Sequence, residues 1–297
     1  MVLALAVADQ RILRGISSTL SFQFTDSEGE PAEPAGAVQI RVQLADGSDL
    51  VPAGTATGGI GAAPRTYALP AVLTLEQLTA TWSDVGDGSV HVTIIDVAGG
   101  FFFSAGQARA QQASLDNTVS YSAADIVAAR LEVESECEEI CARAFVPRFR
   151  RATLDGTGRS VLPTPDSELR SLRSVSVAGT PWDGLLTNPD FADVLIDAEG
   201  FLRLPAALGS WPAGVGNVVV EYEHGWDRPP AELVPAAITR LRSMLNMPKA
   251  GIPDRAERFR AADGGTFELS MPGRYQTGIP DVDAVYLRYS RRSPDLV

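Results

Sequence analysis

The feature that most constrains the fold lies in the last quarter of the sequence, where three different elements must follow one another closely. Residues 217–226 form an apolar run with the composition of a buried strand. Pro229 and Pro230 follow, and proline can continue neither a central strand nor a helix interior, so the run must end before them. Residues 231–247 then place apolar side chains at helical spacing, with Pro235 tolerated because it lies in the opening turn. The sequence therefore predicts a strand, an abrupt stop and an amphipathic helix.

Length and composition limit the classes to which the chain can belong. Its 297 residues leave room for about two domains, and a content of 45% apolar and 21% charged residues is typical of globular chains. The formal charge of −12 argues against a protein that grips DNA phosphates, because that affinity comes from Lys and Arg that displace counterions. We therefore expect DNA to pass an acidic surface without specific binding. No run of about twenty apolar residues predicts a membrane span.

The N-terminal third is predicted to consist of short strands. Val38, Ile40 and Val42 alternate with polar neighbours, which is the period of a half-buried strand. Clusters of Gly, Pro and Asp, such as residues 84–88, separate the strands as turns. About seven strands with regular turn signals predict an immunoglobulin-like β-sandwich for residues 1–110. The Cys and Trp spacing of antibody domains is missing.

A long helix is predicted after a polar linker at residues 111–121. Ser122 and Asp125 form a variant of the N-terminal capping box that starts it. Its apolar side includes Cys137 and Cys141, which we expect to pack as small hydrophobes, because two thiols on one helix face do not make a disulfide framework.

The predicted fold class is therefore multidomain. An N-terminal all-β immunoglobulin-like sandwich precedes a C-terminal α+β domain with long helices and a small antiparallel sheet. The predicted boundaries are 1–110 for the sandwich, 111–121 for the linker, 122–262 for the α+β domain and 263–297 for a C-terminal arm and helix.

Signatures of enzymes and cofactor sites are poor. The only two histidines, His91 and His224, lie in different predicted domains, and a hydrogen-bonded structural role suits His224 better than a catalytic one. The glycines at 59–61 and 214–216 lack the strand-then-helix context of a dinucleotide-binding loop. Lys249, the only lysine, has no glycine-rich phosphate loop before it. We expect no catalytic residue, no cofactor and no metal.

The clearest grouping of charged residues is an acidic helix face that is followed in the sequence by a basic patch. Glu132, Glu136 and Glu139 lie at i, i+4 and i+7 and so share one helix face. Shortly after them, three arginines form the basic patch: Arg148, Arg150 and Arg151. A closed ring presents different surfaces to its two neighbours, and an acidic face with a basic patch suits such a contact. The alternative is a solvated helix face with local ion pairs, each worth only about 0–1 kcal/mol.

A second candidate interface lies near the C-terminus, where an apolar and aromatic stripe runs along the last predicted helix. Its members are Val282, Val285, Tyr286 and Tyr289. Tyrosine is favoured where a surface is buried on a partner. Packing against its own domain is the alternative.

The succession of elements from about Tyr121 to the end resembles the head-to-tail adaptor proteins of long-tailed bacteriophages. The resemblance rests on the order of patterns rather than on a catalytic motif, including residues 148–151, 172–177, 197–203, 217–230, 251–259, 263–269 and 277–289. It implies a structural virion protein at the head–tail junction, made in the host cytoplasm, that binds the portal and the next neck or tail protein. It also implies a homo-oligomeric ring of twelve copies around the DNA channel.

Two other functions compete with this one. The sandwich could be a virion surface module that binds a host glycan or receptor, for which Trp82, Tyr67 and residues 101–103 are the few aromatic candidates. A hydrolase or nuclease is the weakest alternative, because no nucleophile–base pair or metal set can be assembled from the sequence.

Overall fold

The computed structural model describes residues 9–58, 61–181, 194–197, 199–205, 209–247, 258–260, 266–268 and 275–291. Among these described residues, strand residues (37%) outnumber helical residues (23%), so this part of the protein is mostly β. The chain divides into two compact units that are interleaved along the sequence. The first unit comprises Met1–Gly100 and Pro147–Gly225, and the second comprises Phe101–Val146 and Trp226–Val297.

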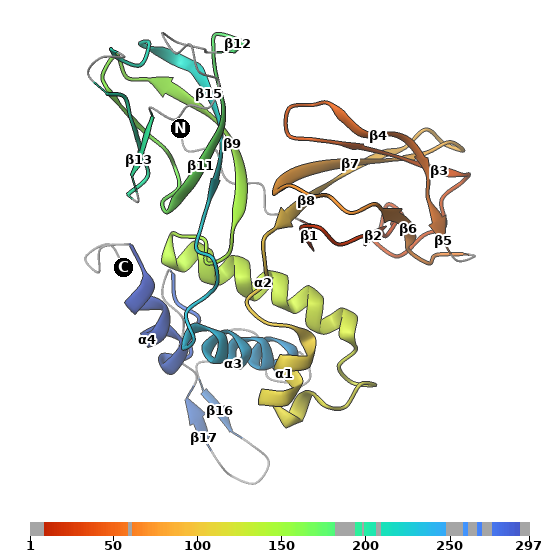
Figure 1. Ribbon diagram of the computed structural model, residues 1–297. Helices are drawn as coiled ribbons and strands as arrows, with labels where there is room; N and C mark the ends of the chain where they lie inside the picture. Colours follow the sequence, from red (N-terminus) through yellow and green to blue (C-terminus); the bar gives the residue numbers. More distant parts are fainter. Residues whose placement is uncertain are drawn as a thin grey trace. The chain divides into compact units, whose positions relative to one another are not determined.

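The N-terminal part of the first unit, here called the N-terminal β region, contains two sheets (Figure 1). The larger sheet has the strand order β1-β8-β7-β3-β4 and the smaller has the order β2-β6-β5. β1 pairs with β8 in parallel, and the other pairs are antiparallel. The strands are β1 (Gln10–Leu13), β2 (Ser18–Phe22), β3 (Val38–Gln43), β4 (Asp49–Thr55), β5 (Thr57–Gly58), β6 (Arg65–Leu69), β7 (Glu76–Asp84) and β8 (Val90–Ala98).

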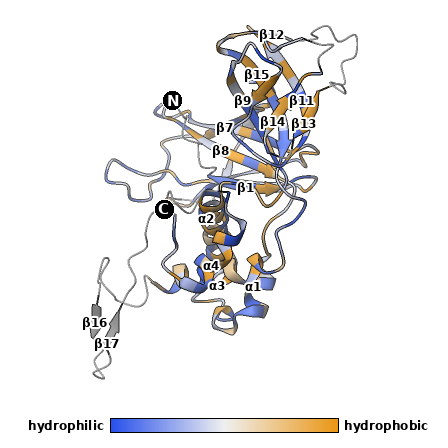
Figure 2. Cartoon of the chain, turned by 90° about the vertical axis from the view of Figure 1, so that its left-hand side faces the viewer, coloured by the Kyte–Doolittle hydropathy of each residue, from blue (hydrophilic) through white to orange (hydrophobic). Residues whose placement is uncertain are grey.

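One apolar core holds these two sheets together. Along β7, every second residue is buried, including Leu78, Ala80 and Trp82. Leu20 of β2 and Leu69 of β6 join the same core from the smaller sheet. The alternation of apolar and polar residues along the strands is visible in Figure 2. Side-chain period therefore explains which face of each strand is buried.

The rest of the first unit, here called the second β region, has a separate core. A four-stranded sheet has the order β12-β11-β15-β9, and a three-stranded sheet has the order β10-β14-β13. Their common core is built around Trp211, Tyr222 and Leu202. The strands are β9 (Arg148–Gly156), β10 (Val161–Pro163), β11 (Leu169–Val177), β12 (Thr180–Pro181), β13 (Leu195–Asp197), β14 (Phe201–Arg203) and β15 (Gly214–His224).

The second unit is built from helices that come from both sides of the second β region in the sequence. The helices α2, α3 and α4 contact one another around one core (Figure 1). That core includes Val133, Leu241 and Tyr286, one residue from each helix. The elements are α1 (Ala105–Gln111), the 3-10 turn η1 (Ala113–Leu115), α2 (Ala123–Cys141), α3 (Leu233–Asn246), α4 (Pro280–Tyr289) and the hairpin β16 (Arg258–Arg260) and β17 (Thr266–Glu268).

Local sequence signals set the ends of the two longest helices. At α2, the Ser122 hydroxyl accepts from the Asp125 N–H, and the Asp125 carboxylate accepts from the Ser122 N–H, which completes the predicted capping box. Its last turn closes on Ala142, whose φ of 53° is left-handed. α3 starts three residues after Pro230, and Pro235 lies in its first turn, where no backbone hydrogen bond is lost.

The predicted fold class is wrong. The sequence was expected to give an immunoglobulin-like sandwich followed by an α+β domain with long helices and a small antiparallel sheet. Instead the protein is mostly β, and the strands of residues 148–224 form a core of their own, while α2 and α3 pack on each other and on α4. Periodicity identifies the buried face of an element but not the element that covers it, and this is why the grouping was mispredicted.

The chain passes from one unit to the other at three points, after Gly100, Val146 and Gly225. The predicted boundaries at 110, 121 and 262 stay predictions. Within the segment expected to be a linker, residues 113–115 form a 3-10 turn, and Leu115 is fully buried in the helical core. Of the expected C-terminal arm and helix at 263–297, residues 263–265, 269–274 and 292–297 lie outside the described residues.

Candidate functional site

The three glutamates of the predicted acidic face lie on α2, but they are not equivalent. Glu132 and Glu139 are exposed, whereas Glu136 is partly buried. The Arg240 guanidinium of α3 donates Nε to Oε2 of Glu136 at 2.7 Å and Nη2 to Oε1 at 2.8 Å. This bidentate contact ties α2 to α3 and raises the pKa of Arg240. Two of the three carboxylates therefore remain on the surface of the helix.

The three arginines of the predicted basic patch all lie on β9, and each has a carboxylate partner within the first unit. Arg148 is buried and pairs with Asp96 of β8. Arg150 donates to Asp166 at 2.8 Å, and Arg151 pairs with Glu221 of the neighbouring strand β15. Because side chains alternate along a strand, Arg148 and Arg150 leave one face of the sheet and Arg151 leaves the other. The three residues thus do not form one continuous surface.

The C-terminal stripe lies on α4 and faces the helical core. Tyr286 is fully buried, and burial raises the pKa of its phenol. Val285 and Tyr289 are partly buried against the same core. The Tyr289 hydroxyl donates a hydrogen bond to the Glu232 carboxylate at 2.5 Å. Glu232 directly precedes α3, so this hydrogen bond links α4 to the start of α3. The stripe thus packs mainly against its own unit, and its role in partner binding stays a prediction.

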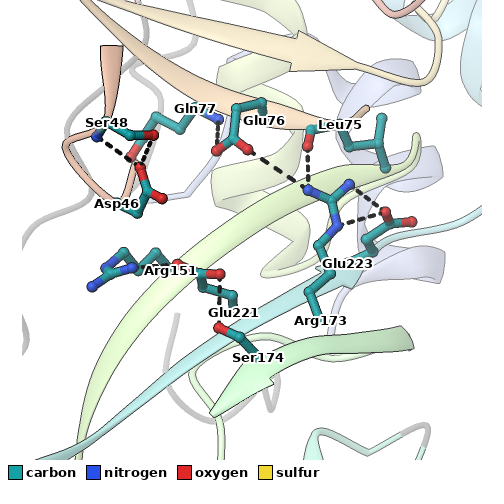
Figure 3. Close-up of polar contacts among 10 residues, drawn as sticks. All are labelled: Asp46, Ser48, Leu75, Glu76, Gln77, Arg151, Arg173, Ser174, Glu221 and Glu223. Atoms are coloured by element: carbon teal, nitrogen blue, oxygen red, sulfur yellow. Dashed lines mark hydrogen bonds and ion pairs between the residues drawn. The ribbon is translucent and has the colours of Figure 1, made fainter. Parts of the chain in front are cut away.

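Sequence reasoning missed a polar junction inside the first unit, where the two β regions meet. Arg173 of β11 is its central residue (Figure 3). Its Nη1 donates to the Leu75 carbonyl at 2.6 Å and lies 3.7 Å from the Glu76 carboxylate at the start of β7. Its Nε donates to Glu223 of β15 at 3.0 Å. One arginine thus contacts the N-terminal β region and the second β region at once.

A β-bulge directs Arg173 away from the regular ladder. Leu172 pairs with Tyr222 and Ser174 pairs with Glu221, so Arg173 is an extra residue between two consecutive rungs. Extra residues of this kind re-aim a side chain. The guanidinium also lies over the Phe149 ring, 4.8 Å from its centroid. No pattern within β11 signals the bulge in the sequence, because the bulge arises from the pairing of β11 with β15.

Carboxylates outnumber guanidinium groups around this junction. Glu221 accepts from the Ser174 hydroxyl at 2.7 Å and pairs with Arg151. On the side of the N-terminal β region, Asp46 accepts from the Ser48 hydroxyl and N–H at 2.6 and 2.8 Å, which lowers the pKa of its carboxyl. Glu76 differs from these acids because burial raises the pKa of its carboxyl, and the nearby Arg173 offsets this only in part.

A second arginine pair strengthens the same contact. Asp96 of β8 accepts from Arg11 Nε at 3.1 Å and also pairs with Arg148 of β9. Gly99 donates its N–H to the Pro147 carbonyl at 2.8 Å. The two β regions of the first unit are thus joined by polar contacts, while their apolar cores remain separate clusters.

Both histidines lie in the first unit, and their surroundings are those of packed side chains. His91 lies 5.0 Å from the Phe22 ring and 5.2 Å from the Phe24 ring. His224 ends β15 with Nε2 3.8 Å from Asp166, which also accepts from the Tyr222 hydroxyl at 2.6 Å. Within the described part of the chain, no group of three His, Cys, Asp or Glu could hold a metal ion.

The aromatic residues considered for glycan binding are mostly buried. Trp82 is fully enclosed, and its indole N–H donates to Thr93 at 3.0 Å. Phe102 and Phe103 belong to the helical core, and Arg130 covers the Phe101 ring at 3.6 Å. A sugar platform requires exposed ring faces, so these side chains do not provide one.

Among the described helices, none is long and apolar enough to cross a membrane.

Comparisons with known proteins give little further information. No family model matches the sequence, and no curated protein matches it. Among solved structures, the chain is similar to one in the neck of an empty GTA particle computed with C6 symmetry, with a TM-score of 0.38 and 16% identity. The match covers 58% of this chain and 80% of that one. Similarity at this level identifies neither a fold nor a function for this chain.

Proposed function

We propose that this chain is a structural virion protein of a bacteriophage neck. In this proposal it forms a homo-oligomeric ring at the head–tail junction, between the portal and the tail or the next neck protein. The ring extends the DNA channel, and the chain has no catalytic activity. Support comes from the succession of elements that resembles head-to-tail adaptors, of which the strand β15, the Pro229-Pro230 stop and the helix α3 are present in the structure.

The observation that carries the proposal is the division of charge on α2. Glu136 is neutralised by Arg240, whereas Glu132 and Glu139 remain exposed, two turns apart on one side of the helix. Neither carboxylate is buried in the helical core, because other residues of α2 supply the core contacts. A ring subunit does need charged positions on its surface, since each subunit meets a neighbour through a different surface.

Charge also supports a channel that lets DNA pass. The chain carries 37 acidic and 25 basic residues, and many of the arginines are already paired with carboxylates inside a unit. A guanidinium group held by a carboxylate is less available to bind a phosphate, and tight binding of DNA requires such groups.

The test is assembly with the portal protein of the same particle. We expect the purified chain to form rings on portal particles, visible by negative-stain electron microscopy, and antibody label on virions to mark the head–tail vertex. The variant carrying Glu132→Lys and Glu139→Lys should lose ring formation while keeping its circular dichroism spectrum. The matched control is Glu28→Lys with Glu30→Lys, which makes the same charge change at exposed positions of the N-terminal β region.

Either of two results would remove the proposal. Label at the tail tip, or none on the particle, would exclude the neck. If the α2 variant and the control assembled equally well at physiological salt, α2 would not be the subunit contact.

A further inference from the structure

The first unit contains two apolar cores that share no residue, so its cohesion depends on what lies between them. The N-terminal β region packs around Trp82, and the second β region packs around Trp211 and Tyr222. The contacts between the two regions include Arg173 with Leu75 and Glu76, and Arg148 with Asp96. Polar contacts of this kind depend on the ionisation of their members, whereas apolar packing does not.

Arg173 is the residue best placed to control this junction. It is the extra residue of a β-bulge and has no partner residue in the ladder between β11 and β15, so the bulge sets the direction of its side chain. Its guanidinium contacts the Leu75 carbonyl and the Glu76 carboxylate in one region and the Glu223 carboxylate in the other, as Figure 3 shows. Only about a quarter of its side chain is exposed (23%), which limits replacement of these bonds by water.

Glu76 is the member of the junction whose charge is least compensated. It is buried to 8% exposure, and among the residues that the structure describes its close cation is Arg173 at 3.7 Å, which Glu223 shares. Its carboxylate also accepts from the Gln77 N–H at 3.1 Å. Further charged groups around it come from three other elements: Glu221 and Glu223 on β15, Arg151 on β9, and Asp46 in the turn after β3. Burial is the main cause of its raised pKa, and Glu221 adds to the effect.

We propose that Arg173 acts as a latch, meaning that its contacts hold the two β regions of the first unit together. We further propose that protonation of Glu76 stabilises this closed arrangement.

Thermodynamic linkage gives the direction. Separation of the two regions returns the Glu76 carboxylate to water, where the ionised form is favoured again. The closed junction therefore binds the proton more tightly than the separated one, so mildly acidic pH favours closure and rising pH favours opening. The Leu75 carbonyl and Glu223 continue to hold Arg173 when Glu76 is neutral, because neither bond involves that carboxylate.

The experiment measures the distance between the two regions in the full chain by double electron–electron resonance. Spin labels at Glu28→Cys and Arg159→Cys report on the two regions from exposed positions. Cys137 and Cys141 are buried, and a labelling reaction on the chain without added cysteines checks that they stay unmodified. We expect a narrow distance distribution at mildly acidic pH that broadens as the pH rises.

Two variants and one control decide the matter. Arg173→Met should give the broad distribution at every pH, and Glu76→Gln should give the narrow one at every pH. Arg203→Met removes an arginine from an exposed pair with Asp197 within the β13–β14 hairpin, and it should behave like the parent chain. Circular dichroism establishes that each variant is folded.

Several outcomes would overturn the proposal. An unchanged distribution in Arg173→Met would show that Arg173 is not a latch. If the distance distribution of Glu76→Gln still broadened as the pH rises, the effect would belong to another titrating group. If Arg173→Met does not fold, the Glu76→Gln result decides alone, since that side chain keeps its volume and loses only its ionisation.

Discussion

The two units of this protein use charge in different ways. The second unit has one continuous apolar core to which α1, α2, α3 and α4 contribute, and the Glu136–Arg240 pair ties α2 to α3. The first unit has two cores, and arginines such as Arg148 and Arg173 lie between them. The helical unit should therefore respond mainly to loss of volume, and the β unit to loss or titration of charge.

The largest expected effect tests the apolar side of this comparison. Leu241→Ala removes a fully buried side chain from the core of α2, α3 and α4 and should lower the free energy of unfolding of the second unit by about 2–5 kcal/mol. Urea unfolding followed by the helical circular dichroism signal measures it. Leu287→Ala on the exposed side of α4 is the control and should change little. Equal effects would mean that the helices are not held by this core.

The next effect tests the polar side. Arg148→Met should lower the stability of the first unit by about 1.5–3 kcal/mol, because Asp96 then keeps only its contact with Arg11 in a partly buried position. Thermal unfolding of the parent and variant chains measures the loss. A variant as stable as the parent would indicate that the junction is held by packing after all.

A third prediction concerns pH. The folded state raises the pKa of Glu76, so between its ordinary value and the raised one the folded chain binds more protons than the unfolded chain, and stability falls as pH rises. Glu76→Gln removes this penalty. We expect its melting temperature to exceed that of the parent at neutral pH and the difference to shrink on acidification. A variant that melts below the parent at neutral pH would contradict the sign, and Glu28→Gln at an exposed position is the control.

The smallest effect lies at the edge of the helical core. Glu136→Gln weakens a partly exposed pair and should cost only about 0.2–1 kcal/mol in urea unfolding. It should also leave ring formation intact, unlike the double reversal at Glu132 and Glu139. Loss of rings in Glu136→Gln would mean that α2 acts through its contact with α3.

Local elements could be predicted from the sequence because their causes are local. The capping box at Ser122 and the alternation through Val38, Ile40 and Val42 gave the helix start and the strand as the structure has them. The stop at Pro229-Pro230 did the same for β15 and α3. Each of these signals lies within a few residues of the feature that it sets.

The pairing of elements could not be predicted in the same way. Arg148, Arg150 and Arg151 looked like one basic patch because they are neighbours in sequence. Their partners Asp96, Asp166 and Glu221 are distant in sequence and lie on different elements, so each arginine is neutralised separately. The latch residue Arg173 depends on a bulge against β15, which no pattern within β11 specifies. Tertiary pairing thus determined both the cores and the candidate site.

The interleaved order of the units has a consequence for how the protein is made. α2 is synthesised long before α4. The hydrogen bond that the Cys141 thiol donates to the Tyr286 carbonyl joins residues 145 positions apart. At roughly 5–20 residues per second, the ribosome needs on the order of ten seconds to cover that distance. During much of that time the apolar side of α2 lacks α3 and α4, while the strands of the second β region emerge and can pair. The helical unit therefore begins synthesis before the second β region but must close after it.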